Sequence, residues 1–186
     1  DLLPVPTRNL LAARRPASIT LAGSVPRLTQ AELLGFADSR LAIPTDPTAY
    51  PAYDSGFHDP AEVYTIIRAE EIAYPTLVKV SSIGKSYQGR DIWIAKISDN
   101  VTVEESEPET LIDALHHACE HITVEQALYM LEQLTLGYGS DPLVTGIVDG
   151  RVTWIVFAVN PDGWAYDLSG GAYHLWRKNR QQYSTY

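Results

Sequence analysis

The feature that most constrains the fold of this chain is the almost continuous apolar stretch 152–159, with the sequence VTWIVFAV. A strand that faces solvent on one side alternates apolar and polar residues, whereas a strand covered on both sides does not. We therefore expect residues 152–159 to form a central strand of a sheet. The sequence that follows, Asn160-Pro161-Asp162-Gly163, is typical of a fixed turn at the end of such a strand.

Helix and strand patterns alternate in the rest of the chain from Tyr53 onward. Asp59-Pro60 predicts a helix start, because aspartate caps the first turn and proline suits the first helical position, and the helix should end before Pro75. Its apolar positions are Val63, Ile66, Ile67 and Ile72. Strand patterns follow at 77–80, 92–97 and 111–115. A second helix should begin at Thr123, with one apolar face made of Val124, Ala127, Leu128, Leu131 and Leu134. This alternation predicts an α/β fold with a mixed central β-sheet flanked by helices on both faces.

The chain is acidic, with 14 Lys and Arg against 23 Asp and Glu, or a formal net charge of −9. Nucleic-acid-binding proteins need clustered cations, and the one tight basic cluster, 177–180, is too short for a nucleic-acid groove. No apolar stretch approaches the length of a membrane span. The single cysteine excludes an internal disulfide. We expect neither nucleic acid nor a membrane among the partners.

Residues 1–50 differ from the rest of the chain, because prolines recur there at 4, 6, 16, 26, 44 and 47. We interpret 1–50 as a proline-rich extended segment, either the tail of a pro-segment or a linker. Residues 51–186 then belong to one domain, since the chain is long enough for one sizeable core and too short to assume two.

His117 and Glu120 are the candidate metal ligands. They lie at the end of the predicted strand 111–115, and the carboxyl end of a sheet strand often carries a functional site in α/β proteins. Catalytic zinc is commonly held by histidine and glutamate, with one position left for water. A histidine and a glutamate at this spacing also occur by chance, so a purely structural role for the pair stays open.

Short motifs at 53–58, 82–87, 89–91, 96–100, 114–118, 160–163 and 176–180 follow one another along the chain. In order and spacing they resemble the zinc carboxypeptidases of the carboxypeptidase A and T group, most closely the bacterial T-type enzymes. The resemblance implies a zinc-dependent metallocarboxypeptidase, a hydrolase that removes C-terminal residues from peptides or proteins. It also favours a secreted, extracellular protein.

By this resemblance His117 and Glu120 are zinc ligands. Arg177 resembles the arginine that polarises the scissile carbonyl and then stabilises the oxyanion; a surface position in the basic cluster is the other interpretation. Cys119 stands where the family carries an arginine that holds the substrate backbone, so substrate binding is expected to be altered here. A small tolerated substitution is the simpler interpretation of Cys119.

The remaining histidines fit other roles. His116 and His121 flank the candidate ligands and are expected to pack or to hydrogen-bond behind them. His58 and His174 are expected at the surface.

The resemblance is incomplete toward the C-terminus, because the family's third zinc ligand, its general base and its Asn-Arg pair for the substrate carboxylate have no counterpart. We expect the N-terminal part of a longer domain, with the missing C-terminal half as its partner and a sheet edge left exposed. Two alternatives stay open. One is a non-catalytic fragment, pseudoenzyme or binding module of the same fold. The other is a metalloenzyme whose site is completed by His174 or Cys119.

An acidic run follows the strand pattern at 92–97. Glu104, Glu105, Glu107 and Glu109 resemble a calcium-binding loop of the T-type enzymes, and clustered carboxylate oxygens suit Ca²⁺. A solvated acidic face is the other interpretation. The expected cofactors are therefore Zn²⁺ and, at this loop, Ca²⁺.

Overall fold

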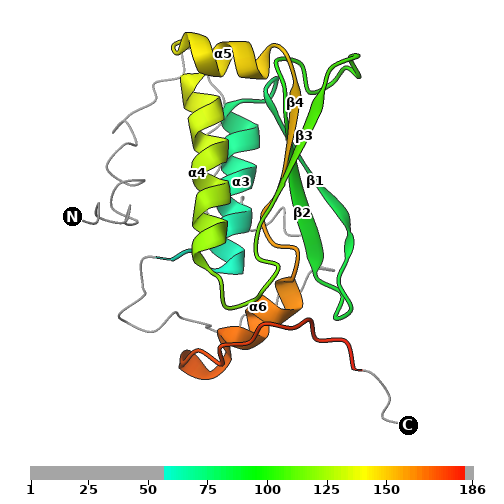
Figure 1. Cartoon of the computed structure of the whole chain (residues 1–186), viewed down its shortest axis with the longest axis vertical. Coiled ribbons are helices and arrows are strands. Elements are labelled where there is room, and N and C mark those ends of the chain that lie inside the picture. Colours follow the sequence, from blue (N-terminus) through cyan, green and yellow to red (C-terminus); the bar gives the residue numbers. More distant parts are fainter. Residues whose placement is uncertain (1–56, 183–186) are drawn as a thin grey trace, which may run out of the picture.

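A computed structural model describes residues 57–182 (Figure 1). The proline-rich segment 1–50 and most of the motif 53–58 lie outside the described residues. The helices are α3 (Pro60–Ala73), α4 (Ile122–Gly137), α5 (Pro142–Val148) and α6 (Pro161–Asp167), with a short 3-10 helix η2 (Ser169–Gly171). The strands are β1 (Val78–Lys85), β2 (Asp91–Ile97), β3 (Glu109–Asp113) and β4 (Val152–Val156). None of these helices combines the length and apolar content that a membrane crossing requires.

The four strands form one mixed sheet in the order β1-β2-β4-β3. β4 lies between β2, to which it is antiparallel, and β3, to which it is parallel. The prediction of a central strand in a mixed α/β sheet is confirmed. β4 ends at Val156, earlier than expected, because the chain leaves the sheet toward α6. There the amide of Asn160 donates to the carbonyl of Leu115, so the segments that follow β3 and β4 run side by side.

Helix α3 begins as predicted. Asp59 caps its first turn, and the Glu62 carboxylate accepts from the Asp59 amide, which completes a capping box. Val63 and Ile67 are buried in the core. The expectation that Ile72 shares their face was wrong: it lies about 140° around the helix from Ile67 and is 39% exposed.

Helix α4 begins at Ile122, next to the predicted start at Thr123. The periodicity predicted its buried positions correctly, and these are Val124, Ala127, Leu128 and Leu131, with Leu134 partly buried beside them. The Thr123 hydroxyl donates to the Glu120 carbonyl and accepts from the Leu115 amide. The start of α4 is therefore tied to the turn that carries the candidate ligands.

Both long helices, α3 and α4, lie side by side on one side of the sheet (Figure 1). The core fills the space between them and the strands, where Val78, Ala95 and Ile155 are buried. The predicted mixed α/β sheet with flanking helices is confirmed, and within residues 57–182 both long helices lie on one face of it. Alternation of strands and helices indicates that the two pack together, but it does not determine on which face each helix lies.

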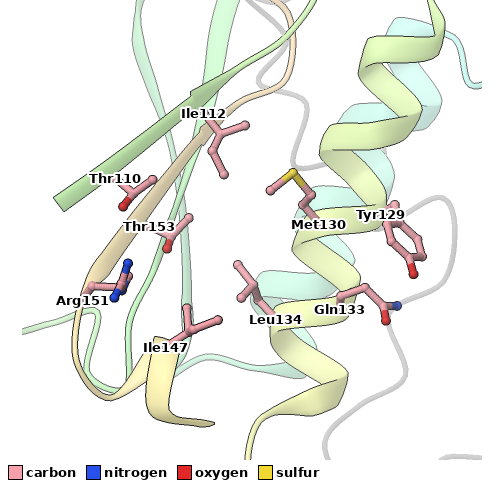
Figure 2. A pocket seen from close by; sticks show the side chains of 9 residues that line it. All are labelled: Thr110, Ile112, Tyr129, Met130, Gln133, Leu134, Ile147, Arg151 and Thr153. Carbon is pink, nitrogen blue, oxygen red and sulfur yellow. The ribbon is translucent and has the colours of Figure 1, made fainter. Parts of the chain in front are cut away.

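An apolar groove lies between α4 and the strands β3 and β4 (Figure 2). Met130 and Leu134 of α4 line one wall, and Ile112 and Thr153 of the strands line the other. β3 is an edge strand of the described sheet, and its Leu111 is 63% exposed. Within residues 57–182, β3 therefore forms a sheet edge of the kind expected from the sequence, with an apolar groove beside it.

Candidate functional site

The structure brings together the three residues that the sequence singled out. His117 Nδ1 lies 3.0 Å from Glu120 Oε1. Arg177 reaches both atoms: its Nη2 is 2.8 Å from His117 Nδ1 and its Nη1 is 3.1 Å from Glu120 Oε1. The guanidinium thus faces the pair as a fork, although Arg177 lies 57 residues beyond Glu120 in the chain.

The proton on His117 decides how these groups interact. Arg177 can only donate, so its contact with Nδ1 is favourable when that nitrogen carries a lone pair. When Nδ1 carries the proton, it donates to Glu120 instead. This hydrogen bond is the main reason that the pKa of Glu120 is held below its usual range, and the hydrogen bond from Arg177 lowers the same pKa further. When Nδ1 carries the lone pair, both this nitrogen and the Glu120 oxygen accept from Arg177, and the pair then favours positive charge beside it.

The same two atoms fit a zinc ion. Nitrogen and oxygen ligands bind zinc at about 2.0–2.2 Å, so two donors 3.0 Å apart can reach one ion. The side chains are 48% exposed at His117, 42% at Glu120 and 54% at Arg177, so the site lies on an open surface.

A third protein ligand does not join the pair in the part of the chain that the structure describes. Among residues 57–182, no histidine, cysteine or carboxylate forms a three-membered ligand group with His117 and Glu120. Cys119 is a half-buried free thiol, and His174 is exposed, with its Nε2 2.9 Å from the carbonyl oxygen of Ser169. Neither residue completes the zinc site in this conformation.

Strained backbone precedes both segments of the site. Leu115 and Leu175 have positive φ angles of 56° and 52°. Leu115 comes just before the turn with His117 and Glu120, and Leu175 comes just before Trp176-Arg177. A left-handed conformation at such residues costs about 1–3 kcal/mol each and persists only where packing enforces it. The two segments therefore take their shapes from the surrounding fold and not from local preference.

Of the two histidines that flank the candidate ligands, only His121 lies as predicted, whereas the packing or hydrogen bond expected for the His116 side chain was wrong. His116 is exposed, with its Nε2 3.6 Å from Asp113 Oδ2. His121 is buried, with its Nε2 3.1 Å from Asp167 Oδ2. Packing behind the candidate ligands, as predicted for His121, is confirmed.

The surface position predicted for His58 was wrong. His58 is 7% exposed. Its Nδ1 lies 2.8 Å from Glu125 Oε2, and its amide donates to the other oxygen of the same carboxylate. The sequence places His58 just before the cap of α3, a position that is commonly exposed, and contains no local sign that α4 passes beside it.

Asp162 has a larger role than the fixed turn that the sequence predicted. Its buried carboxylate accepts hydrogen bonds from the Ser86 hydroxyl at 2.6 Å, the Gln88 amide at 2.9 Å and Arg90 Nη1 at 2.9 Å. These donors come from the motifs 82–87 and 89–91, which therefore serve to anchor α6 to the β1–β2 turn. The one sequence signal for this role was the position of Asp162, an acidic residue directly after Asn160-Pro161 at the start of a helix.

The four glutamates of the acidic run, Glu104, Glu105, Glu107 and Glu109, do not form one cluster in the structure. Glu104 pairs with Lys96 at 3.2 Å, and Glu109 accepts from Trp154 Nε1 at 2.9 Å. Glu105 and Glu107 instead gather with Asp99, with carboxylate oxygens within 4.8 Å of one another. The pKa of Glu107 is raised, first by loss of solvent and then by the neighbouring carboxylates. Calcium binding at this loop stays a prediction.

Comparison with known proteins places these features in a family. The family model for zinc carboxypeptidases matches residues 63–186. A zinc carboxypeptidase of Saccharothrix mutabilis subsp. capreolus is 46% identical over 145 residues, which cover 76% of this chain and 33% of that protein. The inactive metallocarboxypeptidase ECM14 of Saccharomyces cerevisiae is 33% identical over 134 residues, covering 72% of this chain and 31% of that protein.

The fold agrees with the sequence comparison. The crystal structure of thrombin activatable fibrinolysis inhibitor superposes with a TM-score of 0.63 at 27% identity, covering 83% of this chain and 37% of that one. The chain therefore belongs to the zinc carboxypeptidase family, as the sequence motifs predicted. It spans about a third of the length of the curated relatives named above.

Proposed function

We propose that this chain supplies part of the active site of a zinc-dependent metallocarboxypeptidase that hydrolyses C-terminal peptide bonds. The observation that carries the proposal is the convergence of His117 Nδ1, Glu120 Oε1 and the Arg177 guanidinium within 3.1 Å. Family membership supports it, because zinc in this family implies nitrogen and carboxylate ligands of this kind.

His117 and Glu120 would hold the zinc ion. When bound, zinc supplies Lewis acidity, which polarises a carbonyl and makes water acidic near neutral pH. Arg177 would donate hydrogen bonds to the carbonyl oxygen of the scissile bond, and these bonds strengthen as negative charge develops on that oxygen. Cys119 offers no cationic donor for the substrate backbone, so we expect weaker binding of the substrate than an arginine at this position would give.

The first test measures the zinc that the purified chain retains after exhaustive dialysis and its affinity for zinc. Both quantities are compared among matched variants. His117→Ala and Glu120→Gln should lower the zinc affinity at least ten-fold, because each removes one of two ligands. His116→Ala is the control, since it removes an exposed histidine next to the ligand and should leave the affinity unchanged. Equal loss in His116→Ala and His117→Ala would contradict the assignment of ligands.

The second test is hydrolysis of a blocked dipeptide with a free C-terminal carboxylate, with its C-terminal amide as the control substrate. A carboxypeptidase should cleave the first and spare the second. Arg177→Lys should lower kcat about 10²–10³-fold, the loss typical of removing one oxyanion donor, while zinc content stays at the wild-type level. A variant with unchanged kcat would remove Arg177 from the mechanism.

A non-catalytic module of the same fold is the second candidate function. The absence of a third ligand within residues 57–182 favours it, because two ligands hold zinc weakly. A relative described as an inactive metallocarboxypeptidase shows that the family includes such proteins. A chain that retains no zinc and cleaves neither substrate would support this candidate.

We also propose that the remaining part of a carboxypeptidase domain docks on the groove beside β3. The relatives are about three times as long as the matched segment, β3 has an unpaired edge in the described sheet, and apolar side chains line the adjacent groove. Such an edge is a template for a further strand.

The part of the Saccharothrix protein outside the matched segment is a suitable probe for this docking. We expect it to form a 1:1 complex with the chain in sedimentation measurements. Ile112→Lys and Met130→Glu, both in the lining of the groove, should weaken the complex, whereas Leu143→Lys on α5 should not. Self-association of the chain in place of the mixed complex would contradict the docking.

An extracellular location is a further proposal, to be tested by finding the protein in the culture medium of its source.

A further inference from the structure

The N-terminus of α6 contacts both segments of the site, the turn that carries His117 and Glu120 and the segment that carries Arg177. The side-chain amide nitrogen of Asn160, the N-cap of α6, lies 3.2 Å from the His116 carbonyl oxygen and 3.0 Å from the Lys178 carbonyl oxygen. Its carbonyl Oδ1 accepts from the Gly163 amide at 3.0 Å and so caps the helix. His116 directly precedes His117, and Lys178 directly follows Arg177. One buried amide therefore joins the turn of the ligands to the segment of the arginine.

The last residue of α6 makes the corresponding pair of contacts. Asp167 is completely buried. Its Oδ1 accepts from the Trp176 amide at 2.5 Å. Its Oδ2 lies 3.1 Å from His121 Nε2, an ion-pair distance without hydrogen-bond alignment. His121 directly follows Glu120, and Trp176 directly precedes Arg177, so this carboxylate also connects both segments.

Close packing adds a third contact between α6 and the ligand turn. Gly163 lies so near to Ala118 that a Cβ atom on the glycine would be 2.8 Å from the Ala118 Cβ. Ala118 is fully buried and lies between the two candidate ligands. The turn that carries His117 and Glu120 therefore rests directly on the first turn of α6.

We propose that α6 is the element that positions Arg177 against His117 and Glu120, with Asn160 and Asp167 as positioning residues. The proposal rests on the proposed function only in that Arg177 is the cation of the site. A buried carboxylate costs several kcal/mol to desolvate and is seldom the best choice for stability alone. The Asp167 carboxylate accepts from Trp176, directly before Arg177, and lies beside His121, directly after Glu120. This placement supports a positioning role for Asp167.

The test is the rotational freedom of the Arg177 guanidinium in the ¹⁵N-labelled full chain, measured by NMR without added metal. A guanidinium held by both Nη groups rotates slowly and gives resolved Nη–H signals, which Arg177→Lys identifies by their loss. Asn160→Asp keeps the oxygen that caps α6 but loses the amide that bridges the two segments. We expect it to speed up guanidinium rotation at least ten-fold, while exchange of the Trp164 amide, inside α6, changes less than three-fold.

Asp167→Ala should have the same effect on Arg177 and should also expose the Trp176 amide to exchange. His174→Ala is the control, because it alters an exposed residue of the same segment whose side chain contacts Ser169. Unchanged Arg177 signals in a folded Asn160→Asp variant would overturn the proposal, as would equal acceleration at Arg177 and Trp164. Because this measurement needs neither zinc nor hydrolysis, a failure of the proposed enzymatic function would leave it unaffected.

Discussion

Substitution of Gly163 by alanine tests how tightly α6 must pack against the ligand turn. An added Cβ would lie 2.6 Å from Asn160 Nδ2, 2.7 Å from Asn160 Oδ1 and 2.8 Å from the Ala118 Cβ. The Asn160 amide is fixed by its bonds to two carbonyls, and the Ala118 Cβ moves only with its backbone. Neither neighbour can give way by rotation of a flexible side chain.

The expected cost of Gly163→Ala follows from opposing terms. Overpacking of a close-packed site costs about 1–3 kcal/mol, and displacement of Asn160 loses at least one hydrogen bond worth about 0.5–1.5 kcal/mol. Alanine gains up to about 1 kcal/mol over glycine through helix propensity. The net free energy of unfolding should therefore fall by about 1–3 kcal/mol in urea denaturation.

Gly146 provides a matched control, since it lies in α5 with no atom within 4 Å of an added Cβ. Gly146→Ala removes no contact and should raise the free energy of unfolding by up to about 1 kcal/mol. If Gly163→Ala were as stabilising as Gly146→Ala, the packing of α6 on the ligand turn would be refuted.

Two further substitutions test interactions away from the site. His58→Ala should lower the free energy of unfolding by about 1–3 kcal/mol, because it leaves the Glu125 carboxylate without one of its partners. The control, His116→Ala, should change the free energy of unfolding by less than about 0.5 kcal/mol. Equal effects of the two substitutions would show that the His58 contact contributes nothing to stability. Glu107→Gln should raise the melting temperature at pH 7. The pKa of Glu107 is raised in the folded chain, so its charged form opposes folding. The stability that protonated Glu107 contributes is therefore present below the unfolded pKa and is lost as pH rises through the folded pKa. The difference from wild type should disappear in acid. Glu104→Gln should give no such gain, because Glu104 pairs with Lys96 and is not among the carboxylates that raise the pKa of Glu107.

The elements of the fold were largely predictable from the sequence because their signals are local. Asp59-Pro60 defines the start of α3, and the spacing of Val124, Leu128 and Leu131 defines the buried face of α4. Errors arose where a distant element decides the outcome. His58 is buried only because Glu125 of α4 lies beside it, a contact between residues 67 positions apart.

The candidate site shows the same division between local and long-range signals. His117 and Glu120 were identifiable by their spacing, whereas the role of Arg177 came only from the resemblance to a family. The contacts of Asp167 had no signal at all, since an aspartate near the end of a short helix is usually solvated. Its burial depends on the segment 173–177 folding back over α6, which no periodicity in the sequence describes.

The openness of the site bears on how effective its charges can be. The side chain of Arg177 is 54% exposed, and water at this surface weakens its interactions with Glu120 and with any developing oxyanion. Fixed cations and dipoles stabilise a transition state most strongly where water is excluded. His117, Glu120 and Arg177 converge in the structure, and α6 contacts both of their segments, but the other described residues leave these three side chains about half exposed. In the proposed function, a further part of the domain that excluded water from these three side chains would strengthen these interactions, and catalysis would then depend on its docking.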